Sequence, residues 1–174
     1  NRMLAKRVTT VATSFETTRF LDGPLAAKAT TTGNPVRSMV LALARRPYEP
    51  SRAGEPFRLV VFGGSQGARF FSEAVPPALA LLPAGERARL EVIQQCREED
   101  LPGVRTAYEA AGIRATLAAF FQNLPEHIAA AHLVIGRAGA SSVAEIAVLG
   151  RPSILVPLPH AADGDAEDHA GKLF

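Results

Sequence analysis

A glycine-rich stretch between an apolar run and a helical pattern carries the first residues that could do chemistry. The motif GGSQG (residues 63–67) follows the apolar run 57–62 and fits the pattern G-x-S-x-G. This pattern marks the exposed nucleophilic serine of some hydrolases. It also suits a loop whose backbone N–H groups bind a phosphate. Ser65 is therefore a candidate nucleophile or a candidate ligand-binding hydroxyl.

The residues available as partners of Ser65 disfavour the hydrolase. A serine hydrolase needs an acidic residue and a histidine on loops that follow separate strands. Here Asp163 and either His160 or His169 would have to serve, and all three crowd into one loop. No His-Gly-Gly-Gly oxyanion motif precedes Ser65, and its strand is the first of the predicted domain. We therefore favour a binding role for this serine.

A second motif, GRAGASSVAE, combines small residues, two hydroxyls and a carboxylate: Gly139, Ala140, Ser141, Ser142 and Glu145. Small side chains leave a helix N-terminus unobstructed, so its N–H groups and the hydroxyls can surround a diphosphate. The carboxylate, about one turn further on, could accept hydrogen bonds from a ribose diol, as acidic residues do in dinucleotide folds. A helix capped by serine, with a solvated or capping glutamate, is the structural alternative.

A third loop is rich in acidic residues and histidine, and it raises the question of a metal. It contains His160, Asp163, Asp165, Glu167, Asp168 and His169. Neither H-x-x-x-H nor H-E-x-x-H spacing occurs, so we predict a solvated loop, no metal and no cofactor.

Composition narrows the remaining classes. The single cysteine, Cys96, excludes an internal disulfide and a cysteine-based zinc site, and it fits a reducing cytoplasm. The net charge is only +2, the arginines are scattered and tryptophan is absent, which disfavours nucleic-acid binding. The apolar runs are shorter than the roughly 18 residues of a membrane helix.

Regular alternation positions these loops. The pattern predicts strands at 57–64, 88–96, 113–121, 132–136 and 151–158, separated by helices at 65–82, 98–112, 123–131 and 139–150. Asn123 is a predicted N-cap, Gly112 and Gly150 are predicted helix ends, and Pro76-Pro77 should kink or break the first helix. The nearly continuous apolar strands indicate an α/β, Rossmann-like, doubly wound parallel sheet, which binds ligands at the carboxyl ends of its strands.

The sequence before residue 57 lacks the regular alternation of strands and helices. Residues 8–15 predict a strand and residues 38–45 a short helix. The segment 45–56 carries three prolines and several charges, so we predict a linker with a domain beginning near Phe57. Both chain ends fall within patterns, so we expect the sequence to be part of a longer protein.

Several motifs, in order and at matching intervals, strongly resemble the MurG family. They are GNPVR (33–37), VVFGGSQGAR (60–69) and the run from Ala118 to Pro159. This family of bacterial transferases moves N-acetylglucosamine from UDP-GlcNAc onto lipid I, giving lipid II for peptidoglycan. The resemblance covers essentially the whole chain. It implies a GT-B fold of two Rossmann-like domains and an inverting, metal-independent transfer.

The resemblance also implies domains and a donor site. Residues 1–44 would be the tail of the N-terminal acceptor and membrane domain, and 57–174 an incomplete C-terminal UDP-GlcNAc-binding domain, the second half of the GT-B fold. Arg37 would face the donor from the interdomain side, Ser65 would hydrogen-bond it in the cleft, and the Phe121 backbone would contact uracil. Ala140, Ser141 and Ser142 would contact the diphosphate, and Glu145 would contact the ribose. Asn1 would make a further contact with the donor.

The sequence departs from the family at two places. Family members usually have sugar-contacting glutamines in the loop where this chain has Gly164, Asp165 and Ala166. The glycine-rich loop with the proposed general-base histidine, and the patch that docks on the membrane, are not among these residues. The resemblance therefore implies no catalytic residue here and a chain that is inactive alone.

The implied partners are UDP-GlcNAc and, through the other domain, lipid I and a peripheral contact with the cytoplasmic face of the bacterial inner membrane. Cell-wall biogenesis, cell shape and cell division would follow from that role. Two alternatives remain open: another GT-B nucleotide-sugar enzyme, such as an epimerase or a soluble glycosyltransferase, and a non-catalytic UDP-binding module. An NAD-binding domain is less favoured because the G-x-G-x-x-G order is absent from the first loop.

Overall fold

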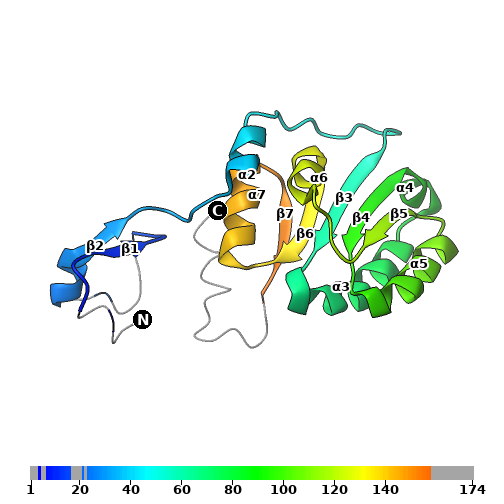
Figure 1. Cartoon of the computed structure of the whole chain (residues 1–174). Helices are drawn as coiled ribbons and strands as arrows, with labels where there is room; N and C mark the ends of the chain where they lie inside the picture. Colours follow the sequence, from blue (N-terminus) through cyan, green and yellow to red (C-terminus); the bar gives the residue numbers. More distant parts are fainter. Residues whose placement is uncertain (1–3, 5–6, 17–20, 22, 158–174) are drawn as a thin grey trace. The chain divides into compact units, whose positions relative to one another are not determined.

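The chain forms two compact units, residues 1–35 and residues 36–174, each described here by itself (Figure 1). The computed structural model describes residues 4, 7–16, 21 and 23–157, with the backbone but not the side chains of 64–68. None of the helices in these described ranges is both long enough and apolar enough to span a bilayer.

The first unit contains a small parallel strand pair. Strand β1 (Val11–Thr13) pairs with β2 (Ala29–Thr31), which follows the 3₁₀ helix η1 (Gly23–Lys28). The Thr13 and Thr31 hydroxyls lie 3.3 Å apart across this pair. The strand predicted over 8–15 therefore forms over only three residues in the middle of that range.

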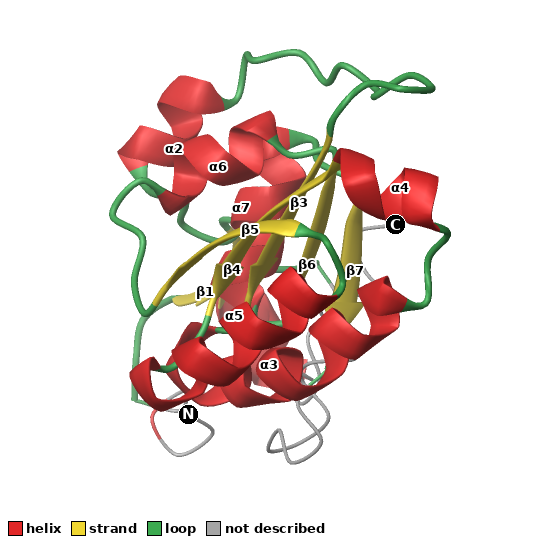
Figure 2. Cartoon of the chain, turned by 90° about the vertical axis from the view of Figure 1, so that its right-hand side faces the viewer, coloured by secondary structure: helices red, strands yellow, loops and turns green. Residues whose placement is uncertain are grey.

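The second unit is built on a five-stranded parallel sheet in the order β5-β4-β3-β6-β7 (Figure 2). The chain starts at the central strand, builds outward through β4 and β5, and then returns to the other side of β3. This order confirms the predicted Rossmann-like, doubly wound sheet. The strands are β3 (Phe57–Phe62), β4 (Leu90–Gln95), β5 (Arg114–Ala118), β6 (Leu133–Arg137) and β7 (Ser153–Val156).

Helices cover both faces of this sheet (Figures 1 and 2). Helices α3 (Gly64–Ala80) and α5 (Leu101–Ala110) lie on one face, and α2 (Ser38–Leu43), α6 (Leu124–Ala130) and α7 (Ala140–Leu149) lie on the other. The central strand supplies both cores because successive side chains point to opposite faces. Leu59 and Val61 pack with Phe71 and Tyr108, while Val60 and Phe62 pack with residues of α2, α6 and α7.

Helix α4 (Ala84–Arg89), directly before β4, was not predicted. The first three residues of the helix predicted over 98–112 form the separate 3₁₀ helix η2 (Glu98–Asp100).

The predicted helix ends are confirmed at three positions. Gly112 follows α5 with φ +67°, and Gly150 closes α7 with φ +64°, so both adopt the left-handed conformation that glycine tolerates best. Asn123 is the N-cap residue of α6, although its side chain makes no capping hydrogen bond.

The prediction that Pro76-Pro77 could break the first helix is wrong. Helix α3 continues through both prolines to Ala80. Each proline lacks the N–H that would bond the carbonyl four residues earlier. Pro76 is fully buried and Val75 belongs to the core, so tertiary packing holds the last turn despite those missing bonds.

Helix α2 and the proline-rich segment after it belong to the second unit. Val40 is completely buried between α2, α6 and α7. The segment 45–56 is held by hydrogen bonds from Arg151 to the Arg46 and Pro47 carbonyls and from Arg89 to the Glu55 carbonyl. The division between units lies before α2, and the assignment of residues 1–44 to an acceptor domain stays a prediction.

Candidate functional site

The two predicted binding motifs meet where the strand order reverses. Strands β3 and β6 are direct neighbours, with Phe62 opposite Gly136, and each is followed by one of the motifs. A Cβ at Gly136 would lie 3.3 Å from the Phe62 carbonyl oxygen, a tight contact that favours a glycine where the two strands approach each other. Open α/β sheets bind ligands outside the carboxyl ends of the strands at such a reversal.

The first motif passes from strand to helix through a single residue. Gly63 is the N-cap of α3 with φ −138° and ψ 5°, and Ser65 is the second residue of the helix. The cap position is thus occupied by Gly63, and the backbone places Ser65 in the first helical turn. N–H groups in a first turn have no partner within their own helix and can face an anion.

The second motif opens α7 in the same way. Gly139 is the N-cap with φ −84°, and a glycine has no side chain to cap the helix, so the alternative in which a serine occupies the cap position is wrong. Ser141 is exposed and Ser142 half-buried. Neither hydroxyl makes a hydrogen bond within the described part of the chain. A Cβ built on Gly139 would meet no atom within 4 Å. Open space therefore borders the N-terminus of a ten-residue helix, next to two hydroxyls.

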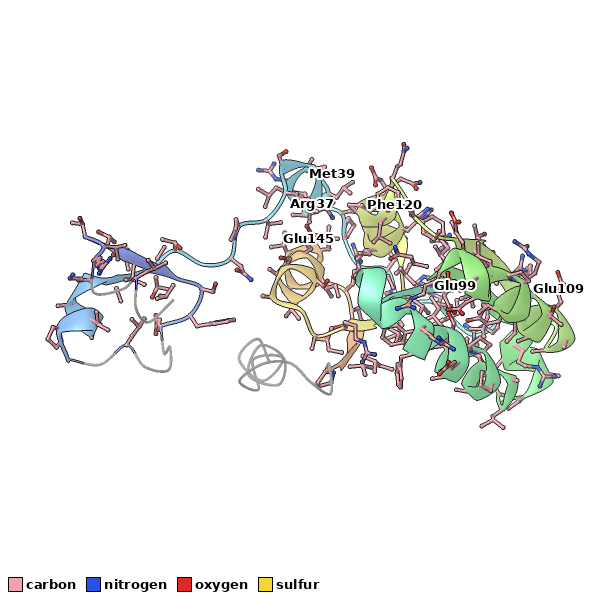
Figure 3. All side chains as sticks on the ribbon, turned by 60° about the horizontal axis from the view of Figure 1, so that its bottom comes forward. Arg37, Met39, Glu99, Glu109, Phe120 and Glu145 are labelled. Carbon is pink, nitrogen blue, oxygen red and sulfur yellow. The ribbon has the colours of Figure 1, made fainter. Side chains whose placement is uncertain are left out.

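Two candidate residues far apart in the sequence form an ion pair. The Arg37 guanidinium donates from Nε to Oε1 of Glu145 at 2.6 Å and from Nη2 to Oε2 at 2.8 Å. Figure 3 shows the two side chains next to each other, one from the start of α2 and the other from α7. The hydrogen bond to Glu145 raises the pKa of Arg37.

The ion pair between Arg37 and Glu145 contributes little to stability because it is partly exposed, but it orients the Glu145 carboxylate. The Arg37 side chain is 56% exposed, whereas the Glu145 side chain is only 14% exposed. An ion pair with one exposed partner contributes about 1 kcal/mol or less. Its bidentate geometry nevertheless holds the carboxylate in one orientation on α7.

The other predicted residues lie farther from the two motifs or outside the described residues. Phe121 follows β5 at the far edge of the sheet, with its ring edge-on to His127 at 5.5 Å. Its neighbour Phe120 is 73% exposed. Asn1 and the loop Gly164–Ala166 lie outside the described residues, as does the acidic loop considered for a metal.

Sequence reasoning missed Arg137, the last residue of β6. Its guanidinium lies over the Phe70 and Phe71 rings of α3 at 4.7 and 5.3 Å and donates to the Pro157 carbonyl at 2.9 Å. Its Nε is buried and has no hydrogen-bond partner among the described residues. A lone arginine closing an apolar strand, directly before a helix opened by small residues, was the signal available in the sequence.

Metal binding has no support in the part of the chain that can be examined. Within residues 4–157, leaving out the undescribed positions, no three histidine, cysteine, aspartate or glutamate side chains gather closely enough to hold an ion.

Fold and site together define the second unit as a Rossmann-like α/β domain whose candidate ligand-binding site lies at the strand-order reversal. Residues 58–174 match the glycosyltransferase family 28 C-terminal domain. The chain belongs to this family, which also confirms the predicted place of the sheet in the C-terminal half of such enzymes. The matched range begins one residue after the predicted domain start.

Curated relatives agree with this assignment. The chain is 55% identical over 163 residues to a UDP-N-acetylglucosamine--N-acetylmuramyl-(pentapeptide) pyrophosphoryl-undecaprenol N-acetylglucosamine transferase of Rhodospirillum centenum, covering 94% of this chain and 43% of the relative. It is 53% identical over 173 residues to the transferase of the same name from Brucella abortus, covering 99% and 45%. The chain thus spans a little less than half the length of these relatives.

A solved structure supports the fold as well. The crystal structure of Acinetobacter baumannii MurG superposes with a TM-score of 0.72 and 25% sequence identity, covering 98% of this chain and 45% of that one. The predicted resemblance to the MurG family is thereby confirmed.

Proposed function

We propose that this chain is the donor-binding half of an inverting glycosyltransferase that moves N-acetylglucosamine from UDP-GlcNAc onto lipid I, forming lipid II. Its relatives carry the corresponding transferase name, and the lipid II formed would enter peptidoglycan synthesis. The single observation that carries the donor role is the open space beside Gly139, where α7 begins next to Ser141 and Ser142, at the reversal of strand order.

The chemistry of the donor explains this arrangement. In an inverting transfer, an acceptor hydroxyl attacks C1 of the sugar while the bond from C1 to the UDP diphosphate breaks. Negative charge then develops on the diphosphate, and preorganised donors lower the barrier where charge develops. The first turns of α3 and α7 supply backbone N–H groups there, and the hydroxyls of Ser65, Ser141 and Ser142 add further donors.

The remaining parts of the donor have matching groups. Glu145 accepts hydrogen bonds from the ribose diol, because a carboxylate oxygen bound to Arg37 keeps a lone pair for a second donor. The exposed side of the Arg37 guanidinium would share its charge between Glu145 and the donor. The Phe121 backbone contacts uracil, and Asn1 completes the donor contacts. The altered residues Gly164–Ala166 stand where the family contacts the sugar, so we expect recognition of the sugar to differ from that of the family.

The other half of the reaction requires a second domain. The acceptor hydroxyl must lose a proton, and no residue described at this edge is placed to take it. We propose that a domain outside these 174 residues supplies the base, binds lipid I and contacts the cytoplasmic face of the membrane. The chain alone therefore binds the donor without transferring the sugar. Through lipid II, the complete enzyme would serve cell shape and division.

Calorimetric titration of the chain tests the donor site. UDP should bind much more tightly than uridine, because the diphosphate makes most of the contacts with α7. Ser142→Ala should weaken UDP by about tenfold, the equivalent of one charge-assisted hydrogen bond, and leave uridine unchanged. An absence of UDP binding at millimolar concentration would refute the donor role.

Transfer itself distinguishes the enzyme from a binding module. The chain should yield no lipid II from UDP-GlcNAc and lipid I. A protein that joins it to a MurG-family N-terminal domain should yield lipid II, and UDP binding without transfer in that protein would favour a non-catalytic module or another nucleotide-sugar enzyme.

A further inference from the structure

A pocket with several cationic side chains lies at the amino ends of the sheet strands, opposite the proposed donor site. A pocket of about 180 Å³ is lined by Arg46, Arg58, His132 and Arg151, together with Glu49. Arg58 is at the start of β3, His132 directly precedes β6, and Arg151 lies two residues before the first residue of β7. The proposed donor site is at the other ends of these strands. A six-residue strand spans roughly 20 Å, so the two sites are separate.

Arg151 is the strongest sign that this pocket binds a ligand. It is only 5% exposed, yet no carboxylate of the described residues lies within ion-pair distance. Its Nη atoms donate to the Arg46 and Pro47 carbonyls, and its guanidinium lies over the Tyr48 ring. Its Nε is buried without a hydrogen-bond partner among those residues. A buried cation without a counter-ion is costly, so a bound anion would relieve it.

The charges around Arg151 add to the uncompensated positive charge of the pocket. Burial, followed by the nearby charge of Arg46, lowers the pKa of Arg151. Arg58 is 3.7 Å from Glu91, but Glu91 also pairs with Arg114 at 3.4 Å. Glu49 lines the pocket without forming an ion pair in the described part of the chain. Three guanidinium groups therefore face one carboxylate across the lining of this pocket.

His132 contributes a neutral donor. Its Nδ1 accepts a hydrogen bond from the Arg58 backbone N–H at 2.8 Å. The neutral ring must then carry its proton on Nε2, so that nitrogen can donate to an oxyanion.

We propose that this pocket, lined by Arg46, Arg58, His132 and Arg151, binds a phosphate group. Guanidinium groups bind phosphate oxygens with two parallel hydrogen bonds, and buried arginine is suited to this role because it stays charged. The phosphate could belong to a soluble phosphorylated molecule or to an anionic lipid headgroup. This proposal is independent of the donor site.

Calorimetric titration of the 174-residue chain with inorganic phosphate tests the site, with uridine nucleotides left out because their own phosphates would compete for the pocket. R46Q and R58Q should each bind phosphate about tenfold more weakly than the unaltered chain. R45Q is the matched control: it removes an equal charge from an exposed neighbour that does not line the pocket, and it should change affinity less than twofold. Arg151 is left intact because it holds the segment 45–56.

Vesicle sedimentation separates the two sources of phosphate. Binding to phosphatidylglycerol vesicles, but not to phosphatidylcholine, that falls in R46Q and R58Q and persists in R45Q would identify a lipid headgroup. Binding of inorganic phosphate alone with the same variant pattern would identify a soluble ligand. The proposal is overturned if neither ligand binds, or if R46Q and R58Q bind as R45Q does. If UDP fails to bind, the phosphate comparison still stands.

Discussion

At the scale of single residues, the pairing of Arg37 with Glu145 gives a glutamate on a helix a defined orientation. Side-chain atoms of the two residues meet at 2.6 and 2.8 Å across 108 positions of sequence. Glu145 is largely buried and Arg37 largely exposed, so a ligand could approach the arginine from solvent while the carboxylate stays in place. The pair thus acts as a preformed part of the proposed ribose subsite.

A change at Glu145 should affect only ligands that carry the ribose diol. Glu145→Gln keeps the shape but removes the charge, and we expect UDP to bind about tenfold more weakly, since charge-assisted hydrogen bonds contribute about 1.5–3 kcal/mol. The affinity for 2′,3′-dideoxy-UDP should be the same in the variant and the unaltered chain. An equal loss for both ligands would instead assign Glu145 a purely structural role.

His132 should make stability depend on pH in a predictable direction. Burial, followed by the charge of Arg58, lowers the pKa of His132 below 6.5 in the folded state. Between the lowered value and 6.5 the unfolded chain binds more protons, so the free energy of unfolding rises with pH in this window. Acidification from pH 7.5 should therefore destabilise the fold, because protonated Nδ1 cannot accept the Arg58 N–H.

The variant His132→Asn isolates this effect, because its amide oxygen can accept the same hydrogen bond without titrating. Urea unfolding from pH 7.5 to 5.0 should show a shallower loss of stability in the variant than in the unaltered chain. Parallel curves would mean that His132 does not contribute.

At the scale of elements, the site depends on two strand-to-helix turns that lie next to each other. Gly63 and Gly139 each cap a helix at the carboxyl edge of a neighbouring strand. The elements could be predicted from the sequence because apolar strands, small-residue helix starts and a left-handed glycine such as Gly150 are local signals. The order of the strands could not, because it depends on pairing between residues far apart, such as Phe62 and Gly136.

Gly139 offers a test of the α7 N-terminus. Gly139→Ala is allowed at φ −84° and meets no atom within 4 Å, so the domain should stay folded, at a cost of about 1 kcal/mol or less. The added methyl group would occupy space next to the helix N–H groups, and we expect UDP affinity to fall about tenfold. Thermal unfolding and calorimetry measure the two effects separately.

Gly103→Ala is the matched control for that methyl group. Gly103 lies in α5 and also has open space around its Cβ position. Alanine there should stabilise the helix by up to about 1 kcal/mol and leave UDP binding unchanged. Equal UDP affinities for the two alanine variants would contradict a diphosphate at α7.

At the scale of the whole molecule, the second unit is a domain whose two sheet edges differ in chemistry. The carboxyl edge offers helix N-termini and hydroxyls, while the amino edge concentrates guanidinium groups around the buried Arg151. The composition did not predict a concentration of charge at either end of the strands, since the net charge is only +2. Arg151 is held by the Arg46 and Pro47 carbonyls of the segment 45–56, a contact that the prediction of a linker did not anticipate.

The most direct test of the donor site is to map UDP binding on the ¹⁵N-labelled chain by NMR. The account predicts amide shift changes concentrated at Gly63 to Gly67, at Gly139 to Ser142 and near Glu145, with little change at Arg58, His132 and Arg151. Changes confined to the latter three residues, or no change at millimolar UDP, would contradict it.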